Sequence, residues 1–357
     1  MSERIEALQN RLRAEQVDAF FVTSEVSREY LSGFRAADGW MLITQEEAYL
    51  LVDSRYIEAA QNQAKGCKVI LFTQMLETLR GLVEKHHIQS MIAEQSRVTV
   101  AEWNSLKKAF PSVELIDSPL LDQELNALRA VKTEKEFADL REAQRLTEEA
   151  FERMLTFLRP GVTEREAALE IEFYMRRHGA ESVAFDLIVI TGAKTSMPHG
   201  VPGEEVIQSG DFVTMDTGAV INGMHSDMTR TVAIGHASDE MKHVYDTVLR
   251  AQLNAIAAVH AGVRCRDVDT AARSAIEQAG YGEYFGHSTG HSVGLEIHEA
   301  PAFSPRSEDV AKENMVITVE PGIYLPGKFG VRIEDMVRVT QNGCQDLTNA
   351  KKELIIL

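Results

Sequence analysis

Five residues whose side chains commonly bind metal ions lie in the C-terminal part of the chain. They are Asp216, Asp227, His291, Glu320 and Glu334. Four carboxylates and one imidazole are more ligands than a single ion with an open coordination position needs. They fit two ions that share bridging carboxylates, and such ions activate water for attack on a carbonyl. The residue types and their order therefore predict a metal-dependent hydrolase.

The two aspartates flank a predicted turn. Asp216 and Asp227 lie on either side of Asn222-Gly223, a dipeptide that favours a two-residue hairpin loop. With that loop, the aspartates are diagonal neighbours on one face of the paired strands, within reach of a shared pair of ions. A longer loop would weaken this relation, and two aspartates that cap turns are the alternative for this pair taken alone.

The two glutamates follow apolar segments that predict buried strands. Glu320 ends the run Met315-Val-Ile-Thr-Val319, where a carboxylate is costly unless it is paired or binds a metal. Glu334 closes Val331-Arg-Ile-Glu334 and shares a strand face with Arg332. A salt bridge to Arg332 or Arg338 on an edge strand is the alternative for Glu334.

Four histidines add to the candidate site. His199 lies in Met197-Pro-His-Gly200, and His287, His291 and His298 fall within 12 residues among several glycines. Glycine lets the backbone approach a ligand closely. A single histidine is more often structural than catalytic, but this grouping beside four carboxylates favours a functional site.

The ligand set also bears on the metal. Oxygen ligands with one imidazole suit a hard ion, whereas zinc usually takes more nitrogen or sulfur ligands. We expect two Mn²⁺ ions, with Co²⁺, Fe²⁺ or Zn²⁺ as alternatives.

Length, charge and cysteine content limit the class of protein. The chain has 357 residues, enough for two domains, and a net charge of -17, which argues against nucleic acid or an anionic membrane as a partner. Three widely spaced cysteines without a CxxC pair indicate a reducing compartment. The charged N-terminus lacks a signal-peptide pattern and no apolar run is long enough to span a membrane, so we expect a cytoplasmic protein.

The chain divides into two parts with different patterns. Up to about residue 120, helical stretches alternate with apolar strand patterns, which predicts an α/β domain with a central sheet. No phosphate-binding glycine motif accompanies these elements, so they do not indicate a nucleotide domain. Residues 117–133 form the expected boundary region, and we expect domains at 1–124 and 125–357.

The second part contains a repeated sequence pattern. Gly161 and Gly179 bracket one predicted helix, and Gly262 and Gly280 bracket another at an offset of 101 residues. A long predicted helix precedes each of these, at 133–158 and about 238–260. The repeated pattern predicts a duplicated helix-helix-sheet unit with the site between its halves, although coincidence between two ordinary helix pairs is the alternative.

The ordered ligand set resembles that of the pita-bread metallopeptidases (family M24), which include prolidase (Xaa-Pro dipeptidase), aminopeptidase P, methionine aminopeptidase and creatinase. The resemblance implies an α/β two-domain protein. Its N-terminal domain would be creatinase-like, and its C-terminal α+β domain would be a pita-bread fold with a pseudo-two-fold repeat. It also implies hydrolysis of the Xaa-Pro bond at the N-terminus of dipeptides or short peptides.

The resemblance assigns a role to each ligand. Asp227 and Glu334 would bridge the two ions. Asp216 would chelate one ion with both oxygens, and His291 and Glu320 would each bind one.

The neighbouring residues would act on the substrate. Glu320 would also serve as general base, and His298 would steady the tetrahedral intermediate. His199 and His287 would line the pocket for the proline, and His199 would share in catalysis. Tyr324 and Arg332 would lie beside them and support substrate binding.

One position departs from the pattern of several prolidases. They carry an arginine after the His-Glu-x-Pro segment, where it can hold the carboxylate of a dipeptide. Here His298-Glu-Ala-Pro301 is followed by Ala302, and Arg306 is displaced. Cleavage of peptides longer than a dipeptide therefore stays open.

Other members of the family give the rival interpretations. Methionine aminopeptidases usually lack the N-terminal α/β domain, and creatinase lacks the complete metal set. A non-enzymatic pita-bread binding module would normally have lost ligands. Relatives are often oligomers, so we also expect a homodimer.

Overall fold

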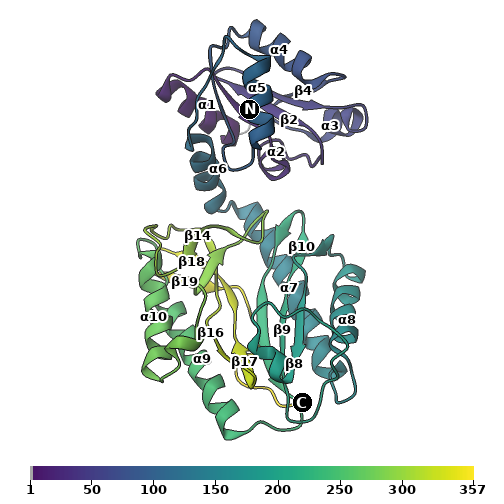
Figure 1. Ribbon diagram of the computed structural model, residues 1–357, viewed down its shortest axis with the longest axis vertical. Helices are drawn as coiled ribbons and strands as arrows, with labels where there is room; N and C mark the ends of the chain where they lie inside the picture. Colours follow the sequence, from purple (N-terminus) through teal and green to yellow (C-terminus); the bar gives the residue numbers. More distant parts are fainter. Residues whose placement is uncertain (1–2) are drawn as a thin grey trace. The chain divides into compact units, whose positions relative to one another are not determined.

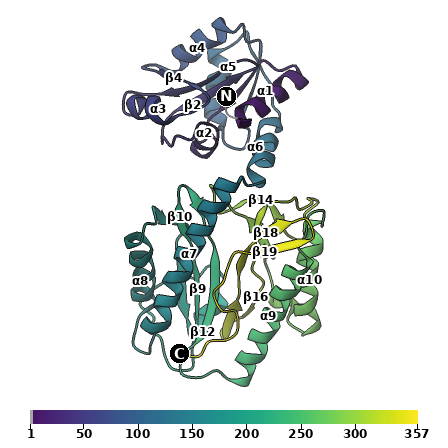
Figure 2. The same cartoon turned by 180° about the vertical axis from the view of Figure 1, so that it is seen from behind.

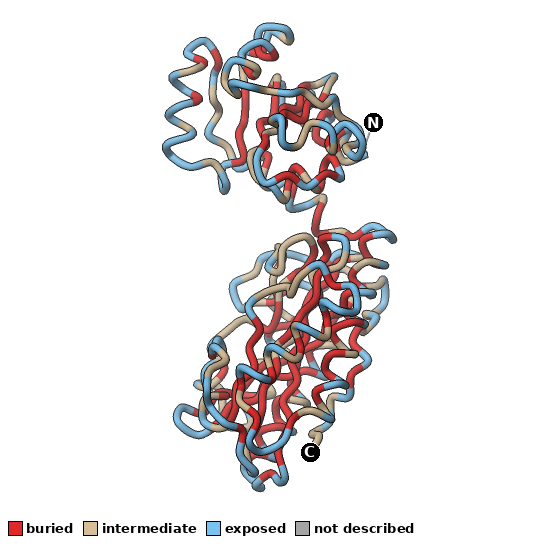
Figure 3. Tube along the Cα trace, turned by 90° about the vertical axis from the view of Figure 1, so that its right-hand side faces the viewer, coloured by how far each residue is buried: buried red, intermediate tan, exposed pale blue. Residues whose placement is uncertain are grey.

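The computed structural model describes residues 3–357, which form two compact units, one ending at Arg129 and the other spanning Ala130–Leu357. The expected boundary between residues 124 and 125 falls inside a helix, α6, at Leu120–Ala130. In this part of the chain no helix is long and apolar enough to cross a membrane. Buried residues run through the interior of each unit (Figure 3).

The N-terminal unit is an α/β structure, as its alternating sequence pattern predicts (Figure 1). Its elements before α6 are α1 Glu3–Glu15, β1 Ala19–Val22, α2 Glu25–Ser32, β2 Trp40–Thr44, β3 Ala48–Val52, α3 Ile57–Gln63, β4 Lys68–Leu71, α4 Met75–Lys85, β5 Ser90–Ala93, α5 Val100–Ala109 and β6 Glu114–Leu115.

These strands form one mixed six-stranded sheet in the order β4-β3-β2-β1-β5-β6. The pairs β1–β2 and β2–β3 are antiparallel, and β3–β4, β1–β5 and β5–β6 are parallel. All four residues of the central strand β1 are buried, which matches its uninterrupted apolar sequence and shows that both faces of the sheet are covered there.

The C-terminal unit combines four long helices with several small sheets. Its elements are α7 Glu134–Phe157, α8 Glu164–Arg177, β7 Ser182–Val183, β8 Ile188–Thr191, η1 Gly192–Ser196, β9 Phe212–Thr217, β10 Ala219–Ile221, β11 Met224–His225, β12 Met228–Ala233, α9 Asp239–Ala258, α10 Cys265–Gln278, η2 Gly282–Tyr284, β13 Gly290–Ser292, β14 Glu299–Phe303, β15 Val316–Val319, β16 Gly322–Leu325, β17 Phe329–Arg332, β18 Asp335–Thr340 and β19 Gly343–Asp346.

The strands of this unit lie between two helix pairs. The sheets have the orders β11-β10-β7, β12-β9-β8, β14-β13-β15-β18-β19 and β16-β17. Helices α7 and α8 lie on one side of the strands, and α9 and α10 lie on the other, in both views of the chain (Figures 1 and 2). The elements that carry the candidate ligands therefore meet in the middle of the unit.

The repeated pattern in the sequence corresponds to a structural repeat. Helices α8 and α10 both have 14 residues, and they begin and end at the predicted offset of 101 positions. The four bracketing glycines all have positive φ: Gly161 (97°), Gly179 (114°), Gly262 (90°) and Gly280 (85°). Only glycine adopts this backbone region without strain. The same turn geometry therefore encloses the corresponding helix of each half.

Candidate metal centre

The predicted hairpin places the two aspartates as expected. Its turn is Asn222-Gly223, with positive φ at both residues (49° and 77°). Across the ladder, Asp216 lies opposite Thr229. Asp227 precedes Thr229 by two residues, so the three side chains share one face. Gly218 allows this arrangement, because a Cβ there would lie 2.0 Å from the carbonyl oxygen of Ser226.

His291 reaches the aspartates from β13. A Cβ on the preceding Gly290 would lie 1.8 Å from the Thr318 carbonyl oxygen, so glycine brings β13 against β15. The Nδ1 of His291 lies 3.1 Å from the Ser292 carbonyl oxygen, which can only accept a hydrogen bond. The Nδ1 atom therefore carries the proton, and Nε2 has a free lone pair for a metal.

The Nε2 atom of His291 faces two of the carboxylates. It lies 3.5 Å from Asp227 Oδ2 and 3.5 Å from Glu320 Oε1. Ligand atoms of Asp227, His291 and Glu334 all lie within 4.8 Å of one another. Burial, and then the neighbouring His298, lower the pKa of His291 to about 4, so its imidazole is neutral at pH 7.

Glu320 and Glu334 enter from the ends of two strands. The backbone N–H of Glu320, directly after β15, donates to the Thr289 carbonyl oxygen at 2.7 Å. Glu334 lies between β17 and β18, and its Oε2 accepts a 2.7 Å hydrogen bond from the Thr229 hydroxyl. Among residues 3–357 no ion pair joins Glu334 to either arginine of the salt-bridge alternative, since Arg332 pairs with Asp216 and Arg338 pairs with Glu134.

The cluster carries more buried negative charge than the protein balances. Asp216 Oδ1, Asp227 Oδ1 and Glu334 Oε1 are buried and have no hydrogen-bond partner among residues 3–357. Such atoms are expensive unless a ligand satisfies them. Together with the free Nε2 of His291, they form the oxygen-rich, single-imidazole donor set expected for two hard divalent cations.

The pKa values of the carboxylates also indicate a site for bound cations. Burial first, and then the charges of Glu334, Asp216 and Glu320, raise the pKa of Asp227 well above its ordinary value. The pKa of Glu334 is raised well above its ordinary value by burial and by the repulsion of Glu320 and Asp216. Burial raises the pKa of Glu320 to about 8. Bound cations would let all three stay ionised at neutral pH.

The cluster opens into a cleft of about 800 Å³. The predicted site residues that line it, besides the five ligands, are His199, His287, His298, Arg332 and Ala302. The ring of His298 packs edge-on against that of His291, with centroids 4.4 Å apart. The apolar part of the wall includes Leu169, Phe185, Leu187, Ile188, Val201 and Pro202. The cleft thus combines a charged floor with apolar sides, as small-molecule sites commonly do.

A hydrogen-bonded chain connects the pocket histidine to a ligand. His287 Nε2 lies 2.9 Å from the Tyr324 hydroxyl, which accepts a 2.9 Å bond from Arg332 Nη1. Arg332 Nη2 then donates to Asp216 Oδ2 at 2.6 Å. Burial lowers the pKa of His287 to about 4, so a neutral ring accepts the Tyr324 proton. In the described chain Tyr324 itself does not line the cleft and lies behind this wall.

Two residues that contact the cluster were not predicted from the sequence. Thr229 donates to Glu334 Oε2 and accepts from Arg332 Nε at 2.9 Å, and Arg230 donates to the backbone carbonyl of Glu334 at 2.6 Å. Both lie on β12, only two or three residues after Asp227. Alternation along that strand could have placed Thr229 on the ligand face, but nothing in the sequence connects Arg230 with Glu334.

A bilobed α/β unit around a buried cluster of four carboxylates and one imidazole defines a metal-dependent hydrolase. The comparisons with known proteins specify the family. Residues 138–341 match metallopeptidase family M24, and residues 4–131 match the creatinase/prolidase N-terminal domain. The chain belongs to metallopeptidase family M24, which implies divalent metal ions, and the pita-bread resemblance of the sequence is confirmed.

Several relatives resemble the chain over its whole length. A solved structure of an Xaa-Pro dipeptidase from Bacillus anthracis is 43% identical, with a TM-score of 0.96 and 99% of each chain covered. An X-Pro aminopeptidase structure from Thermotoga maritima is 37% identical, with a TM-score of 0.92 and 99% coverage of each chain. An Xaa-Pro dipeptidase from Pyrococcus furiosus is 35% identical over 99% of this chain and 100% of that protein.

Proposed function

We propose that this protein hydrolyses the bond between an N-terminal residue and a following proline, in dipeptides or short peptides, with two divalent metal ions. The observation that carries the proposal is the set of buried carboxylate oxygens without partners among residues 3–357, which face one cleft beside the free Nε2 of His291. Full-length likeness to Xaa-Pro dipeptidases and to an X-Pro aminopeptidase supports the substrate class.

The metal ligands follow from the cluster. Asp227 and Glu334 would bridge the two ions, and His291 and Glu320 would each bind one. Asp216 would chelate one ion, although its Oδ2 atom also receives the hydrogen bond from Arg332. When bound, the ions lower the pKa of a water molecule and polarise the substrate carbonyl. We expect Mn²⁺ because hard oxygen ligands dominate, with Co²⁺, Fe²⁺ or Zn²⁺ as alternatives.

The chain's own residues would handle protons and charge. The carboxyl group of Glu320 would take the proton of the attacking water and pass it to the proline nitrogen. His298, which packs against His291, would donate to the oxygen that becomes negative in the tetrahedral intermediate.

The proline ring would occupy the pocket beside His199 and His287, which both line the cleft, and His199 would share in catalysis. His287 is neutral and fixed by two hydrogen bonds, one from its Nδ1 to the Ser288 carbonyl oxygen at 2.8 Å and one at Nε2 with Tyr324. A neutral, fixed ring offers an apolar face without an unpaired donor. Tyr324 and Arg332 would support this pocket from behind.

A substrate panel on a folded variant tests the proposal. We expect wild-type protein, stripped of metal and then loaded with Mn²⁺, to cleave Ala-Pro or Ala-Pro-Gly-Gly and to leave Ala-Ala intact. Glu320→Ala should reduce kcat by about 10²- to 10⁴-fold, because it removes the general base. Circular dichroism would establish that the variant is folded. Equal cleavage of Ala-Ala, or normal activity of the folded variant, would contradict the proposal.

We also propose a compartment and an assembly for the protein. The three cysteines are free, and they are far apart in sequence, which fits a reducing, cytoplasmic environment. The family resemblance of the sequence implies an oligomer, so we propose a homodimer. Light scattering after size-exclusion chromatography would give the mass directly, to be compared with 39.8 kDa for one chain.

A further inference from the structure

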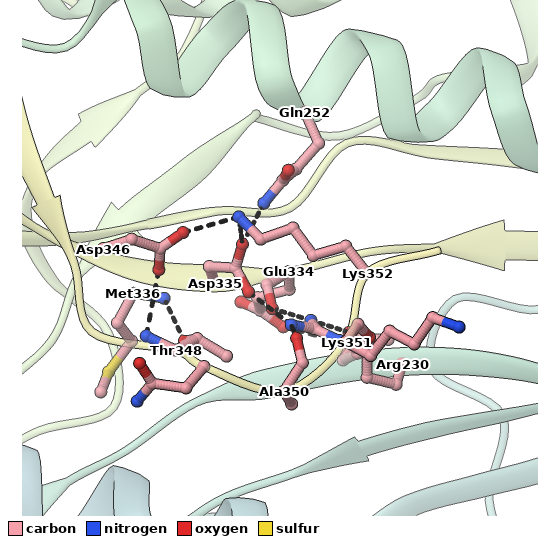
Figure 4. Close-up of polar contacts among 12 residues, drawn as sticks. Arg230, Gln252, Glu334, Asp335, Met336, Asp346, Thr348, Ala350, Lys351 and Lys352 are labelled. Carbon is pink, nitrogen blue, oxygen red and sulfur yellow. Dashed lines mark hydrogen bonds and ion pairs between the residues drawn. The ribbon is translucent and has the colours of Figure 1, made fainter. Parts of the chain in front are cut away.

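A buried arginine lies directly behind the candidate ligand Glu334. Arg230, on β12, is 1% exposed and is among the largest fully buried side chains of the described chain. A guanidinium has five N–H donors. Their acceptors are the carbonyl oxygens of Lys351 (3.0 Å), Thr229 (2.9 Å), Glu334 (2.6 Å) and Ala350 (2.8 Å) and the Oδ1 of Asp335 (2.7 Å). Figure 4 shows Arg230 with Glu334, Asp335, Ala350 and Lys351.

Acidic and basic side chains beside Arg230 complete a buried network. The carboxylate of Asp335 is fully buried, and its Oδ2 accepts from Gln252 and lies 2.5 Å from Lys352 Nζ. Lys352 also pairs with Asp346 at 2.6 Å. Two cations and two carboxylates therefore balance in charge, and the fully buried pair at the centre, Arg230 and Asp335, is compensated. Removal of one partner would leave a charge without compensation.

The network meets the candidate ligand at its backbone. Glu334 lies outside both β17 and β18, so no regular ladder holds it. Its N–H donates to the Thr229 carbonyl oxygen at 3.1 Å, and its carbonyl oxygen accepts from Arg230. Its Oε2 accepts from the Thr229 hydroxyl, which leaves Oε1 as its one polar atom without a partner in residues 3–357. Arg230 thus fixes the peptide from which Oε1 is directed into the cluster.

We propose that Arg230, held in place by Asp335 and Lys352, is a positioning residue that sets the metal affinity of the site through Glu334. The C-terminal residues Ala350–Lys352 take part through two carbonyl groups and one ammonium group. A metal site tolerates displacements of only about 0.5 Å in its ligands, so a loosened Glu334 peptide weakens binding. The inference rests on Glu334 as a metal ligand, but not on any substrate.

The first variant is Arg230→Lys, which keeps the charge and loses the fork of five donors. We expect the dissociation constant for Mn²⁺, measured by competition with a chromophoric chelator, to rise about 10- to 100-fold, as for other residues that orient metal ligands. Circular dichroism of the metal-free variant would establish that it is folded. An unchanged dissociation constant in folded Arg230→Lys would overturn the proposal.

The second variant, Lys352→Met, applies if Arg230→Lys does not fold, and the chain offers a matched control for it. Lys352 and Lys194 have side chains that are each 19% exposed, and each bridges a fully buried carboxylate (Asp335 or Glu164) and a more exposed one. Lys194 has no tie to Glu334 among the interactions of residues 3–357. We expect Lys352→Met, but not Lys194→Met, to weaken Mn²⁺ binding.

Equal Mn²⁺ affinity in Lys352→Met and wild type would overturn the proposal. It would also be overturned if Lys194→Met weakened Mn²⁺ binding as much as Lys352→Met, since that would reflect general destabilisation. Because binding is measured without peptide, the result stands apart from the proposed function. Wild-type protein that binds Mn²⁺ but does not cleave Xaa-Pro substrates would contradict only that function.

Discussion

We expect substrate length to depend on Ala302. It pairs directly with His291 across β13 and β14, so its side chain shares a sheet face with that ligand, and it lines the cleft. Arg306, the nearest alternative cation in sequence, is exposed and does not line the cleft in the described chain. Position 302 therefore offers no guanidinium beside His291, and the arginines among the described residues that line the cleft are Arg165 and Arg332.

A substitution at this position tests its effect on specificity. Ala302→Arg should raise kcat/KM for Ala-Pro relative to Ala-Pro-Gly-Gly by about 10- to 150-fold, since a charge-assisted hydrogen bond contributes about 1.5–3 kcal/mol. Ala302→Met, of similar length but without charge, serves as the control. The same ratio in both variants would show that side-chain bulk, and not the charge, acts on the substrate.

The buried carboxylates predict an unusual pH dependence for the metal-free protein. In the folded state the pKa of Glu320 is raised from 4.5 to about 8, so the folded protein keeps a proton that the unfolded chain releases. This contribution to stability is fully present below pH 4.5 and is lost as the pH rises through about 8. The thermal unfolding midpoint of protein kept metal-free by a chelator should therefore move to lower temperature between pH 5 and pH 8.

Bound Mn²⁺ should abolish that decrease, because the ions stabilise the ionised carboxylates. Glu320→Gln, which cannot ionise at this position, should show a smaller decrease than wild type in the metal-free state. A midpoint that rises from pH 5 to pH 8 in chelated wild-type protein would contradict this account.

At the scale of elements, the repeat supplies a matched pair of helix starts. Thr163 caps α8 by accepting from the Glu166 N–H, and Glu166 accepts from the Thr163 N–H in return. The residue at the equivalent position of α10 is Arg264, which makes no side-chain cap bond in the described structure. The two helices thus differ at their starts although their lengths agree.

Thr163→Ala should lower the free energy of unfolding by about 1 kcal/mol, because it leaves helix N–H groups without their acceptor. Arg264→Ala should change the free energy of unfolding by only about 0.3 kcal/mol, since only an exposed ion pair with Asp267 is lost. Urea unfolding followed by circular dichroism would measure both. Equal losses of stability in the two variants would show that the Thr163 cap of α8 contributes no more than the exposed ion pair of Arg264.

Elements with strong local signals could be predicted from the sequence. The long helices at 133–158 and 238–260, the Asn222-Gly223 turn and the glycine-bracketed helices all depend on residues close in the chain. Helix α6 was expected to be part of a boundary region, because Ser118-Pro119 and Lys132-Thr133 outweighed its helical pattern. The pairing of β12 with the segment after β17 could not be predicted, since it joins residues 105 positions apart.

At the scale of the whole molecule, all the candidate ligands lie in one of the two units. Metal binding should therefore stabilise Ala130–Leu357 and leave the N-terminal unit unchanged. Free Mn²⁺ at 100 times its dissociation constant adds about 2.7 kcal/mol per ion to the unit that binds it. Differential scanning calorimetry with and without chelator should show one transition that shifts and one that does not. A shift of both transitions by the same amount would contradict the assignment.

The cluster also has a consequence for how the chain reaches its native state. Thr229 and Glu334 meet only after the halves of the C-terminal unit have docked, and contacts between residues so distant in sequence form late and slowly. Each half could complete its own helices and hairpins earlier from local contacts. We therefore expect the ions to bind late in folding, and a chain that is still being synthesised would lack Glu334 until the residues after β17 are made.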